Sequence, residues 1–485
     1  MNKITFKSAM PFVVLIAVAI AAVFVPTLPN FDIGKYNTAD MAWMLVATAL
    51  VFLMTPGLAF FYGGMVHRKN ILSTMMKSVV AAGVVGVLWI VVGYSLCFGD
   101  SVGHVIGNPS THFFFKGVNS GEPWPGTSIP KSLFSVFQLM FAIITPGLVV
   151  GAIAERMRFV SYVLFTVLFS LLVYAPLAHW SWHPDGFLAR MGALDFAGGT
   201  VVHISAGCAA LAGAMVLKPR IAHLKNIENT PSNIPYVLIG TGLLWFGWFG
   251  FNAGSALAAN ATAVSAFFTT NTAAAAAGLS WMFFDVLKGK KPSVTGFCIG
   301  AVVGLVAITP AAGYVAIPQS IFIGVIAAVI SNVAVYIKSR SSLDDTLDVF
   351  PCHGIGGMVG MLMTGVFASK AINPAINVDG WAYGNFSFFL TQLKAMSIAV
   401  TYSFVVSYAI FKFINFIVPL RVSNQEEEEG LDATQHNEKY VQGTILVATK
   451  EGMVEREVQP EFFETISNVS NERTNGTVTT ADYSK

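Results

Sequence analysis

The chain contains the stretch Gly198-Gly199-Thr200-Val201-Val202-His203-Ile204-Ser205-Ala206-Gly207 and, in its second half, the stretch Phe350-Pro351-Cys352-His353-Gly354-Ile355-Gly356-Gly357. Each places one histidine in an apolar, glycine-rich segment long enough to cross a bilayer. An ionisable side chain there is costly, so it usually faces a bundle interior or a substrate path. Histidine can also gain or lose a proton near neutral pH, which favours a path along which protons move. The alternative is that His203 and His353 are unrelated packing residues bonded to neighbouring backbone.

Composition places the chain among polytopic membrane proteins. Hydrophobic residues make up 54% of the 485 residues and charged residues only 11%, whereas a soluble chain carries about a quarter charged residues. The net charge of +2 is too small to indicate a nucleic-acid partner. The cysteines lack CxxC spacing, which argues against a disulfide framework and a structural zinc site, and we expect no metal or cofactor. They are Cys97, Cys208, Cys298 and Cys352.

Apolar runs of about 20 residues recur along the chain and predict an all-α protein with eleven transmembrane helices. We expect them near residues 41–66, 75–98, 133–154, 159–179, 197–217, 233–254, 261–287, 293–312, 316–337, 351–369 and 389–418.

Basic residues follow every second span and predict the orientation. Lys and Arg gather after the first, third, fifth, seventh, ninth and eleventh spans, at positions 68–69, 156–158, 218–225, 288–291, 338–340 and 421. By the positive-inside rule, the first long span starts outside and the C-terminus lies in the cytoplasm. Lys3 and Lys7 before an apolar run predict that residues 1–25 are a signal peptide or an uncleaved signal anchor. The transmembrane domain then covers residues 40–418.

Eleven spans that start outside permit two five-span halves of opposite orientation plus one final helix. His203 and His353 then lie on the last helix of each half. Inverted repeats with a site at their interface are a common transporter architecture. The repeat is supported only by Ile144-Thr145-Pro146 and Ile308-Thr309-Pro310 in corresponding spans.

Longer motifs make the chain resemble the ammonium transporters of the Amt/Mep/Rh superfamily, on the Amt side. The resemblance runs from about residue 40 to residue 440. It rests on the segments 55–64, 151–156, 195–203, 247–255 and 348–357.

The resemblance implies a role for each candidate residue. His203 and His353 match the twin pore histidines, and Phe141 and Phe251 match a stacked phenylalanine gate. Phe141, Trp182 and Ser255 match the outer ammonium-recruiting site, with Trp182 expected in the loop after the fourth span. Gln138, Asp195 and Trp248 match supporting positions of the vestibule and pore, although Asp195 also reads as a helix N-cap. Asp344, Asp345 and Asp348 match a cytoplasmic regulatory surface.

The resemblance also implies partners. Residues 419–440 resemble the family's C-terminal regulatory segment, which packs on the cytoplasmic face, couples the subunits of a homotrimer and meets a PII-type regulator. Asn437, Lys439 and Pro419 depart from the usual pattern there. Residues 441–485 extend beyond the common end of the family, and their composition predicts a largely disordered cytoplasmic tail.

The expected function is ammonium transport across the cell membrane by a protein that is not an enzyme. Ammonium, or methylammonium, is recruited at the outer aromatic site and deprotonated. Ammonia then crosses a hydrophobic pore while the paired histidines relay the proton. Two alternatives stay open: a passive Rh-like ammonia or carbon dioxide channel, and an ammonium sensor that signals through its tail.

Overall fold

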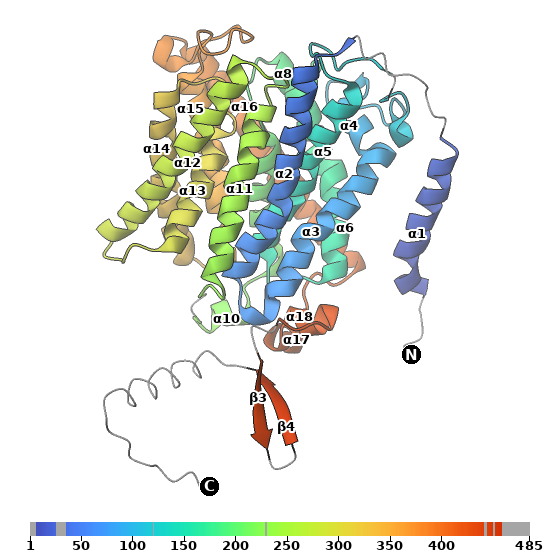
Figure 1. The fold of residues 1–485 in the computed structure, drawn as a ribbon, viewed down its shortest axis with the longest axis vertical. Helices are drawn as coiled ribbons and strands as arrows, with labels where there is room; N and C mark the ends of the chain where they lie inside the picture. Colours follow the sequence, from blue (N-terminus) through green and yellow to red (C-terminus); the bar gives the residue numbers. More distant parts are fainter. Residues whose placement is uncertain are drawn as a thin grey trace. The chain divides into compact units, whose positions relative to one another are not determined.

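A computed structural model describes residues 6–25, 35–119, 121–227, 230–440, 444–449 and 452–457. The chain forms two compact units, Met1–His436 and Asn437–Lys485. In the first unit, long helices lie side by side in a bundle, as Figure 1 shows. The predicted polytopic, all-α membrane architecture is confirmed.

The bundle helices coincide with the predicted apolar segments, several of them broken into consecutive pieces. The first half of the bundle contains α2 (Thr38–Met65), η2–α3–η3–α4 (Arg68–Asn70, Ile71–Leu88, Trp89–Gly93, Tyr94–Phe98), α5 (Lys131–Ile153), α6–η5–α7 (Phe159–Phe169, Ser170–Tyr174, Ala175–Trp182) and η6–α9 (Gly199–Ile204, Ser205–Leu217). The second half contains α11 (Ile234–Gly254), α12 (Ala261–Leu287), α13 (Val294–Ile308), α14 (Ile317–Ser339), η7–α15 (Phe350–Ile355, Gly356–Phe367) and α16 (Phe386–Ile417).

Shorter pieces complete the first unit. They are α1 (Phe6–Val23), η4 (Phe113–Phe115), α8 (Phe187–Arg190), α10 (Ile221–Leu224), η8 (Trp381–Tyr383), α17 (Asn424–Glu429) and α18 (Leu431–His436). The antiparallel strands β1 (Ser101–Val102) and β2 (Ile106–Gly107) pair Ser101 with Gly107. The helix α1 covers the apolar run of the predicted signal segment, and its cleavage stays a prediction.

Nine helical segments among the described residues are long and apolar enough to cross a membrane. The helix α13 is shorter, and α12 is long but carries the polar run Thr269-Thr270-Asn271-Thr272. The count of eleven spans and their orientation therefore stay predictions.

Polar residues in the loops determine where several helices begin. Asn37, Asn233, Asn260, Ser293 and Asn385 each accept a hydrogen bond from a backbone N–H of the first turn of α2, α11, α12, α13 and α16. These bonds satisfy donors that a helix otherwise leaves free, which is costly near a membrane.

The fourth helix is longer than the predicted span 159–179, because α7 continues to Trp182. Trp182 is thus the last helical residue, whereas we expected it in the following loop. Tertiary bonds hold this last turn: Trp180 Nε1 donates to Val105 O at 2.6 Å, and Trp182 Nε1 donates to Asp195 O at 3.1 Å.

Glycine brings helices from the two halves into backbone contact. A Cβ on Gly207 in α9 would lie 2.2 Å from the backbone nitrogen of Gly354 in η7. Such close crossings are typical of membrane helix pairs, because small residues let the backbones approach. This crossing positions the two helices that carry His203 and His353.

The second unit contains the strands β3 (Thr444–Thr449) and β4 (Gly452–Glu457), which pair antiparallel with Thr444 opposite Glu457. Part of the predicted disordered tail, residues 441–485, therefore has regular backbone structure. The remainder of that prediction lies outside the described residues.

Candidate functional site

His203 and His353 lie together in the bundle core, on η6 and η7. The two Nδ1 atoms are 3.4 Å apart and the ring centroids 5.5 Å apart. The residues are only 1% and 4% exposed. A nitrogen–nitrogen contact of this kind needs one imidazole to donate and the other to accept. The structure therefore brings the two sequence-predicted histidines into one pair.

Aspartates at the starts of both π-helical segments position this pair. Asp195 accepts hydrogen bonds from the backbone N–H groups of Gly198, Gly199 and Thr200 at the start of η6. Asp345 accepts bonds from Val349 and Phe350 at the start of η7. Asp195 precedes His203 by the same number of residues as Asp345 precedes His353. These contacts match the helix N-cap role that the sequence also suggested for Asp195.

Two phenylalanine rings cover the imidazoles on one side. The rings of Phe141 and Phe251 are 4.2 Å apart at 37°, and the Phe251 ring lies 6.0 Å from His203. Phe141 comes from α5 and Phe251 from α11, so neighbouring helices supply one ring each. Both are buried and close direct access from this side to the histidines.

Trp182 and Ser255 lie beyond the phenylalanines, at what we call the aromatic end of the bundle. The Trp182 ring meets Phe141 edge to face at 5.8 Å. Ser255 follows α11, and its hydroxyl donates to Phe251 O at 2.8 Å. Because that bond uses the serine proton, the oxygen lone pairs remain available as acceptors. Phe141 thus contacts Trp182 on one side and Phe251 on the other.

Trp248 and Gln138 border this row of side chains. The Trp248 ring stacks on His203 at 5.3 Å, and its Nε1 donates to Thr309 Oγ1 at 2.9 Å. Gln138 is buried on α5, and its Oε1 has no hydrogen-bond partner within the described part of the chain. The buried Nε2 of His203 likewise has no partner there, so it is free to bond a small guest.

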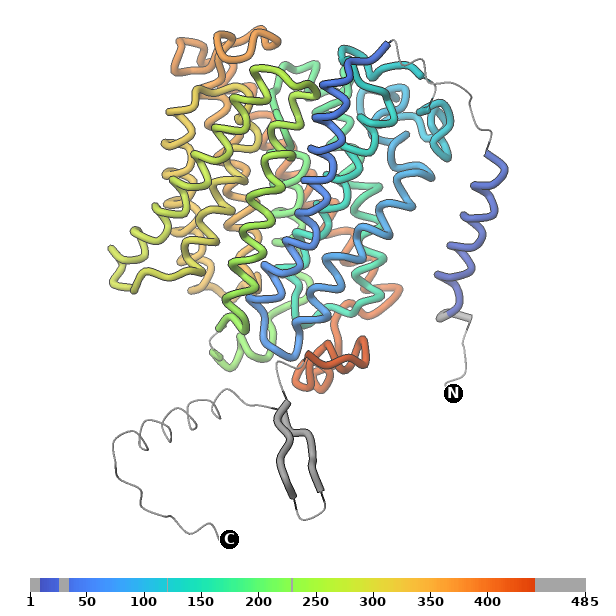
Figure 2. Tube along the Cα trace, in the orientation of Figure 1, coloured from blue at the N-terminus to red at the C-terminus, as the bar shows by residue number. Residues whose placement is uncertain are grey.

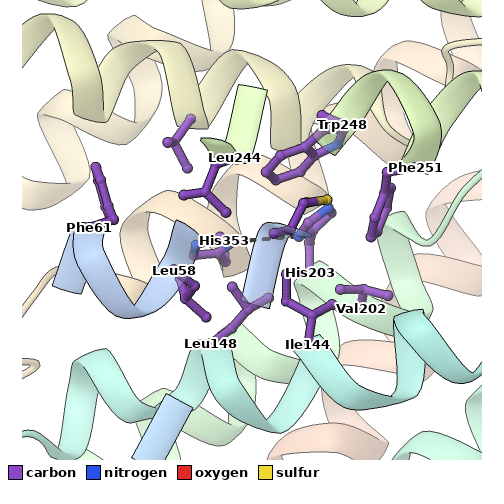
Figure 3. Close-up of a pocket in the computed structure, with 12 residues that line it drawn as sticks. Leu58, Phe61, Ile144, Leu148, Val202, His203, Leu244, Trp248, Phe251 and His353 are labelled. Carbon is purple, nitrogen blue, oxygen red and sulfur yellow. Dashed lines mark hydrogen bonds between the residues drawn. The ribbon is translucent and has the colours of Figure 1, made fainter. Parts of the chain in front are cut away.

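His203 and His353 both line a cavity of about 10 Å³, roughly the space that one water-sized molecule needs. Figure 3 shows the two histidines between Phe251 on one side and Phe61 on the other. The other residues that line the cavity are apolar apart from the tryptophan nitrogen. They are Met54, Leu58, Ile144, Leu148, Val202, Leu244, Trp248 and Val302. Such walls accommodate a small neutral molecule far better than an ion.

The predicted regulatory aspartates lie at the opposite end of the bundle, which we call the charged end. Asp344 is 2% exposed, and its carboxylate accepts from Arg220 Nε at 2.9 Å and Arg220 Nη2 at 3.0 Å. Asp345 is fully buried, and Asp348 pairs with Lys338 at 2.8 Å. Asp344 and Asp345 thus lie beneath the surface of the single subunit, where they hold loops together, and their regulatory role stays a prediction.

Glu155 completes this charged network. It accepts from Arg220 Nη1 at 2.6 Å and from the backbone N–H of His67 at 2.7 Å. Although burial raises the pKa of Glu155, the bonds from His67 and the Arg220 charge outweigh it and lower the pKa to about 2. In the same way Arg220 and Arg156 hold the pKa of Asp344 well below its usual range, against the effect of burial. The network joins loops from four parts of the chain.

Of the predicted segment 419–440, residues 419–436 belong to the first unit and pack on the charged end through α17 and α18. Arg158 Nη2 donates to Glu426 Oε2 at 2.9 Å, and Arg421 Nη2 donates to Glu427 Oε2 at 2.7 Å. Asp432 accepts from the backbone N–H groups of Leu72 and Ser73 at the start of α3. The bonds of Glu426 and Asp432 connect the segment to the bundle, and the bond between Arg421 and Glu427 lies within the segment.

Sequence reasoning missed two groups of residues. Glu155 lies in the segment 151–156 that carries the resemblance and Arg220 among the basic positions 218–225, but neither pattern indicates that the two residues pair. The apolar cavity residues Leu58, Phe61 and Ile144 also lie in quoted motifs, but nothing there indicates which of them face the cavity, since their helices are apolar on every face. Thr309 lay in a noted tripeptide, but nothing there indicated its bond to Trp248.

Known proteins resemble this chain in sequence and in fold. The family described as the Ammonium Transporter Family matches residues 42–441. An ammonium transporter of Aquifex aeolicus is 47% identical over 408 residues, which cover 84% of this chain and 94% of that protein. The crystal structure of Saccharomyces cerevisiae Mep2 is similar with a TM-score of 0.78 at 34% identity, covering 83% of this chain and 95% of that one. A structure titled Sensor Amt Protein is similar with a TM-score of 0.75 at 29% identity, covering 82% and 98%.

Proposed function

This chain belongs to the ammonium transporter family, and from that premise we propose that it carries ammonium across the cell membrane. Ammonium is recruited at the aromatic end and loses a proton where the path becomes dry beyond Phe141 and Phe251. Ammonia then crosses the cavity while the histidine pair relays the proton. The observation that carries this proposal is the stack of Phe141 and Phe251 directly beside the buried pair of His203 and His353.

Recruitment suits a small cation with four N–H donors. The ring faces of Trp182 and Phe141 attract a cation by roughly 0.5–2 kcal/mol. The Ser255 oxygen accepts one hydrogen bond, since its own proton is committed to Phe251 O. The Asp195 carboxylate is committed to capping η6, so it contributes negative potential and not a direct contact.

Deprotonation follows from desolvation. The cavity beyond the phenylalanines is nearly all apolar, and a charged group is strongly disfavoured in such surroundings. Neutral ammonia keeps one lone pair and three donors. The free Nε2 of His203 gives it a polar partner that the apolar walls lack. The contact between the two Nδ1 atoms provides a route for the proton.

The same device discriminates against potassium. Potassium matches ammonium in charge and approximate size but has no proton to release. A path that demands deprotonation therefore rejects potassium at the dry segment, and the gate need not measure size finely.

The test is transport by the variants His203→Ala and His353→Ala. We expect impaired methylammonium uptake or weaker exclusion of potassium, measured in liposomes that contain the purified protein. If both variants take up methylammonium and exclude potassium like the wild type, the histidine path is wrong.

A passive gas channel is the first alternative. The contact of Trp182 with Phe141, together with the free lone pairs of Ser255, favours a site for a cation. Electrical recording from protein-containing liposomes separates the two, because a passive channel for ammonia gives no current when ammonium is added.

An ammonium sensor is the second alternative. The similarity to a structure titled Sensor Amt Protein supports this alternative. That protein covers 82% of this chain. A sensor would lose nitrogen signalling and keep uptake when residues 441–485 are deleted.

The proposed assembly is a homotrimer. Asn271 lies in the middle of α12 and is exposed on the outer wall of the single subunit. Phe267 and Phe268 of the same helix are also exposed. A polar amide is costly against lipid, so a second copy of the chain covers it. A PII-type regulator is proposed at the charged end, where α17 and α18 form part of the outer surface.

A further inference from the structure

The long helix α16 lies outside the row of side chains that runs from Trp182 to the histidine pair. Within the described part of the chain, it supplies none of the residues that line the cavity. Two of its side chains, Tyr402 and Gln392, nevertheless bond the backbone of segments that precede and follow Trp182. Tyr402 and its partner Leu172 are 230 residues apart in sequence, and Figure 2 traces the bundle that brings their helices together.

Tyr402 supplies a hydrogen bond that the sequence removes from the fourth helix. In an α-helix the carbonyl of Leu172 would accept from the backbone N–H four residues later, but that residue is Pro176, which has no N–H. The Tyr402 hydroxyl donates to Leu172 O at 2.7 Å. Leu172 is 47% exposed on the outer wall, where an unpaired carbonyl is costly in lipid. The tyrosine hydroxyl therefore stabilises η5, from which α7 continues.

The ring of Tyr402 also packs against the last turn of α7. Its centroid lies 4.5 Å from that of Trp180, at an angle of 55°. Trp180 precedes Trp182 by two residues and is also held by its bond to Val105 O. Tyr402 therefore contacts the fourth helix both before α7 begins and near its end, which limits how far α7 can rotate or shift.

Gln392 holds the segment that receives the Trp182 indole. The glutamine is fully buried, its Nε2 donates to Leu194 O at 2.8 Å, and its Oε1 accepts from Leu194 N at 2.9 Å. The next residue, Asp195, offers the carbonyl oxygen to which Trp182 Nε1 donates. Two bonds from one side chain determine the orientation of this backbone as well as its position.

We propose that Tyr402 and Gln392 are positioning residues that hold the Trp182 indole against Phe141. Tyr402 holds the helix that carries the indole, and Gln392 holds the backbone that the indole bonds. A binding site needs such support, because its side chains must be held in the productive geometry. The inference rests on the proposed recruitment of ammonium by Trp182 and Phe141, and it adds α16 to the parts of the fold that determine substrate affinity.

The alternative is that α16 only stabilises the bundle. Loss of these hydrogen bonds would then lower the melting temperature and leave the KM for methylammonium unchanged. The two explanations therefore differ in a quantity that depends on the substrate.

The experiment compares Tyr402→Phe and Gln392→Met in the full-length protein in liposomes. The first keeps the ring and removes the hydroxyl, and the second keeps a side chain of similar length without the amide. Tyr408→Phe and Ser397→Ala are matched controls on the same helix, because the described contacts of that ring and that hydroxyl lie within α16.

We expect each of the two variants to raise the KM for methylammonium about three- to tenfold and to change the maximal rate less than about twofold, because lost hydrogen bonds loosen the recruitment site and leave the path beyond it intact. The controls should behave like the wild type. An unchanged KM in both variants, or an equal rise in the controls, would overturn the proposal.

A double-mutant cycle tests whether the two residues act through Trp182. In a Trp182→Leu background, Tyr402→Phe and Gln392→Met should leave the KM unchanged, because the indole that they position is absent. A further rise of the same size in this background would place their action elsewhere and overturn the proposal.

Hydrogen exchange separates this inference from the proposed function. Backbone amides of α7 should exchange faster in the two variants than in the wild type, and amides of the distant helix α14 should not change. If the wild-type protein took up no methylammonium, the proposed function would be wrong, whereas faster exchange of α7 would still support the role of α16 in holding Trp182. Unchanged exchange of α7 in both variants would contradict that role.

Discussion

Ser255 shows how one residue's bonding decides what it can offer a substrate. Its hydroxyl proton points to Phe251 O, which leaves the oxygen as an acceptor beside Trp182 and Phe141. His203 offers a free Nε2 in the same way, because its Nδ1 is engaged by His353. The Ser255 oxygen and His203 Nε2 can therefore each bond a molecule in the proposed path.

At this scale, Ser255→Ala tests the recruitment site. Loss of one hydrogen bond to a charged group should raise the KM for methylammonium about tenfold and leave the maximal rate little changed. Uptake assays in liposomes measure both. Ser255→Thr keeps the hydroxyl and should behave like the wild type, and an unchanged KM in Ser255→Ala would exclude the serine from recruitment.

At the scale of helices, the site depends on a crossing. The backbones of α9 and η7 touch at Gly207 and Gly354, four and one residues from the histidines in sequence. Phe141 and Phe251 meet because α5 and α11 flank the same core. The separation of helix axes thus determines whether the imidazoles can share a proton.

Gly207→Ala tests this crossing, because the added methyl group would lie 2.2 Å from a backbone nitrogen that cannot move alone. The helices must separate, so uptake should fall more than tenfold, with a destabilisation of about 1–3 kcal/mol. Methylammonium uptake and thermal melting measure these effects. Gly242→Ala on α11 is the matched control, since its methyl group meets nothing within 4 Å. Normal uptake by Gly207→Ala would show that the crossing tolerates more space.

At the scale of the whole molecule, the charged end ties distant segments together. Glu155 follows α5, Arg220 precedes α10 and Asp344 follows α14, and their bonds hold the loops in one cluster. From the segment 419–440, Asp432 accepts a bond from the start of α3 and Glu426 accepts one from Arg158. Electrostatics at this end therefore contributes to the stability of the first unit.

That contribution should depend on pH through Glu155. Its pKa falls from 4.5 to about 2 on folding, so its stabilisation is complete above pH 4.5 and disappears as the pH falls toward 2. At pH 7, Glu155→Gln should cost about 3 kcal/mol, and the difference from wild type should shrink as the pH decreases. Thermal melting of both proteins at pH 7, 5 and 3 tests this. Asp345, whose pKa burial raises to about 6, acts in the opposite sense but is present in both proteins. An equal difference in melting temperature at pH 7 and pH 3 would contradict the assignment.

Truncation after residue 440 tests the division of the whole molecule into two units. Because Met1–His436 is compact by itself, the shortened protein should melt and transport methylammonium like the full chain. Lost nitrogen signalling with normal uptake would support the sensor alternative, and lost uptake would contradict the independence of the two units.

The sequence by itself determined the membrane class, the approximate helices and the positions of His203 and His353, because hydropathy and motif order are properties of a continuous stretch. Tertiary structure decided that the two imidazoles lie 3.4 Å apart, that the helix of Trp182 extends to that residue, and that Asp344 and Asp345 lie beneath the surface. It also brought Glu155 to Arg220 and Leu58 to the cavity. These features depend on how helices rotate and how closely their backbones approach, and helices that are apolar on all faces carry no local signal for either.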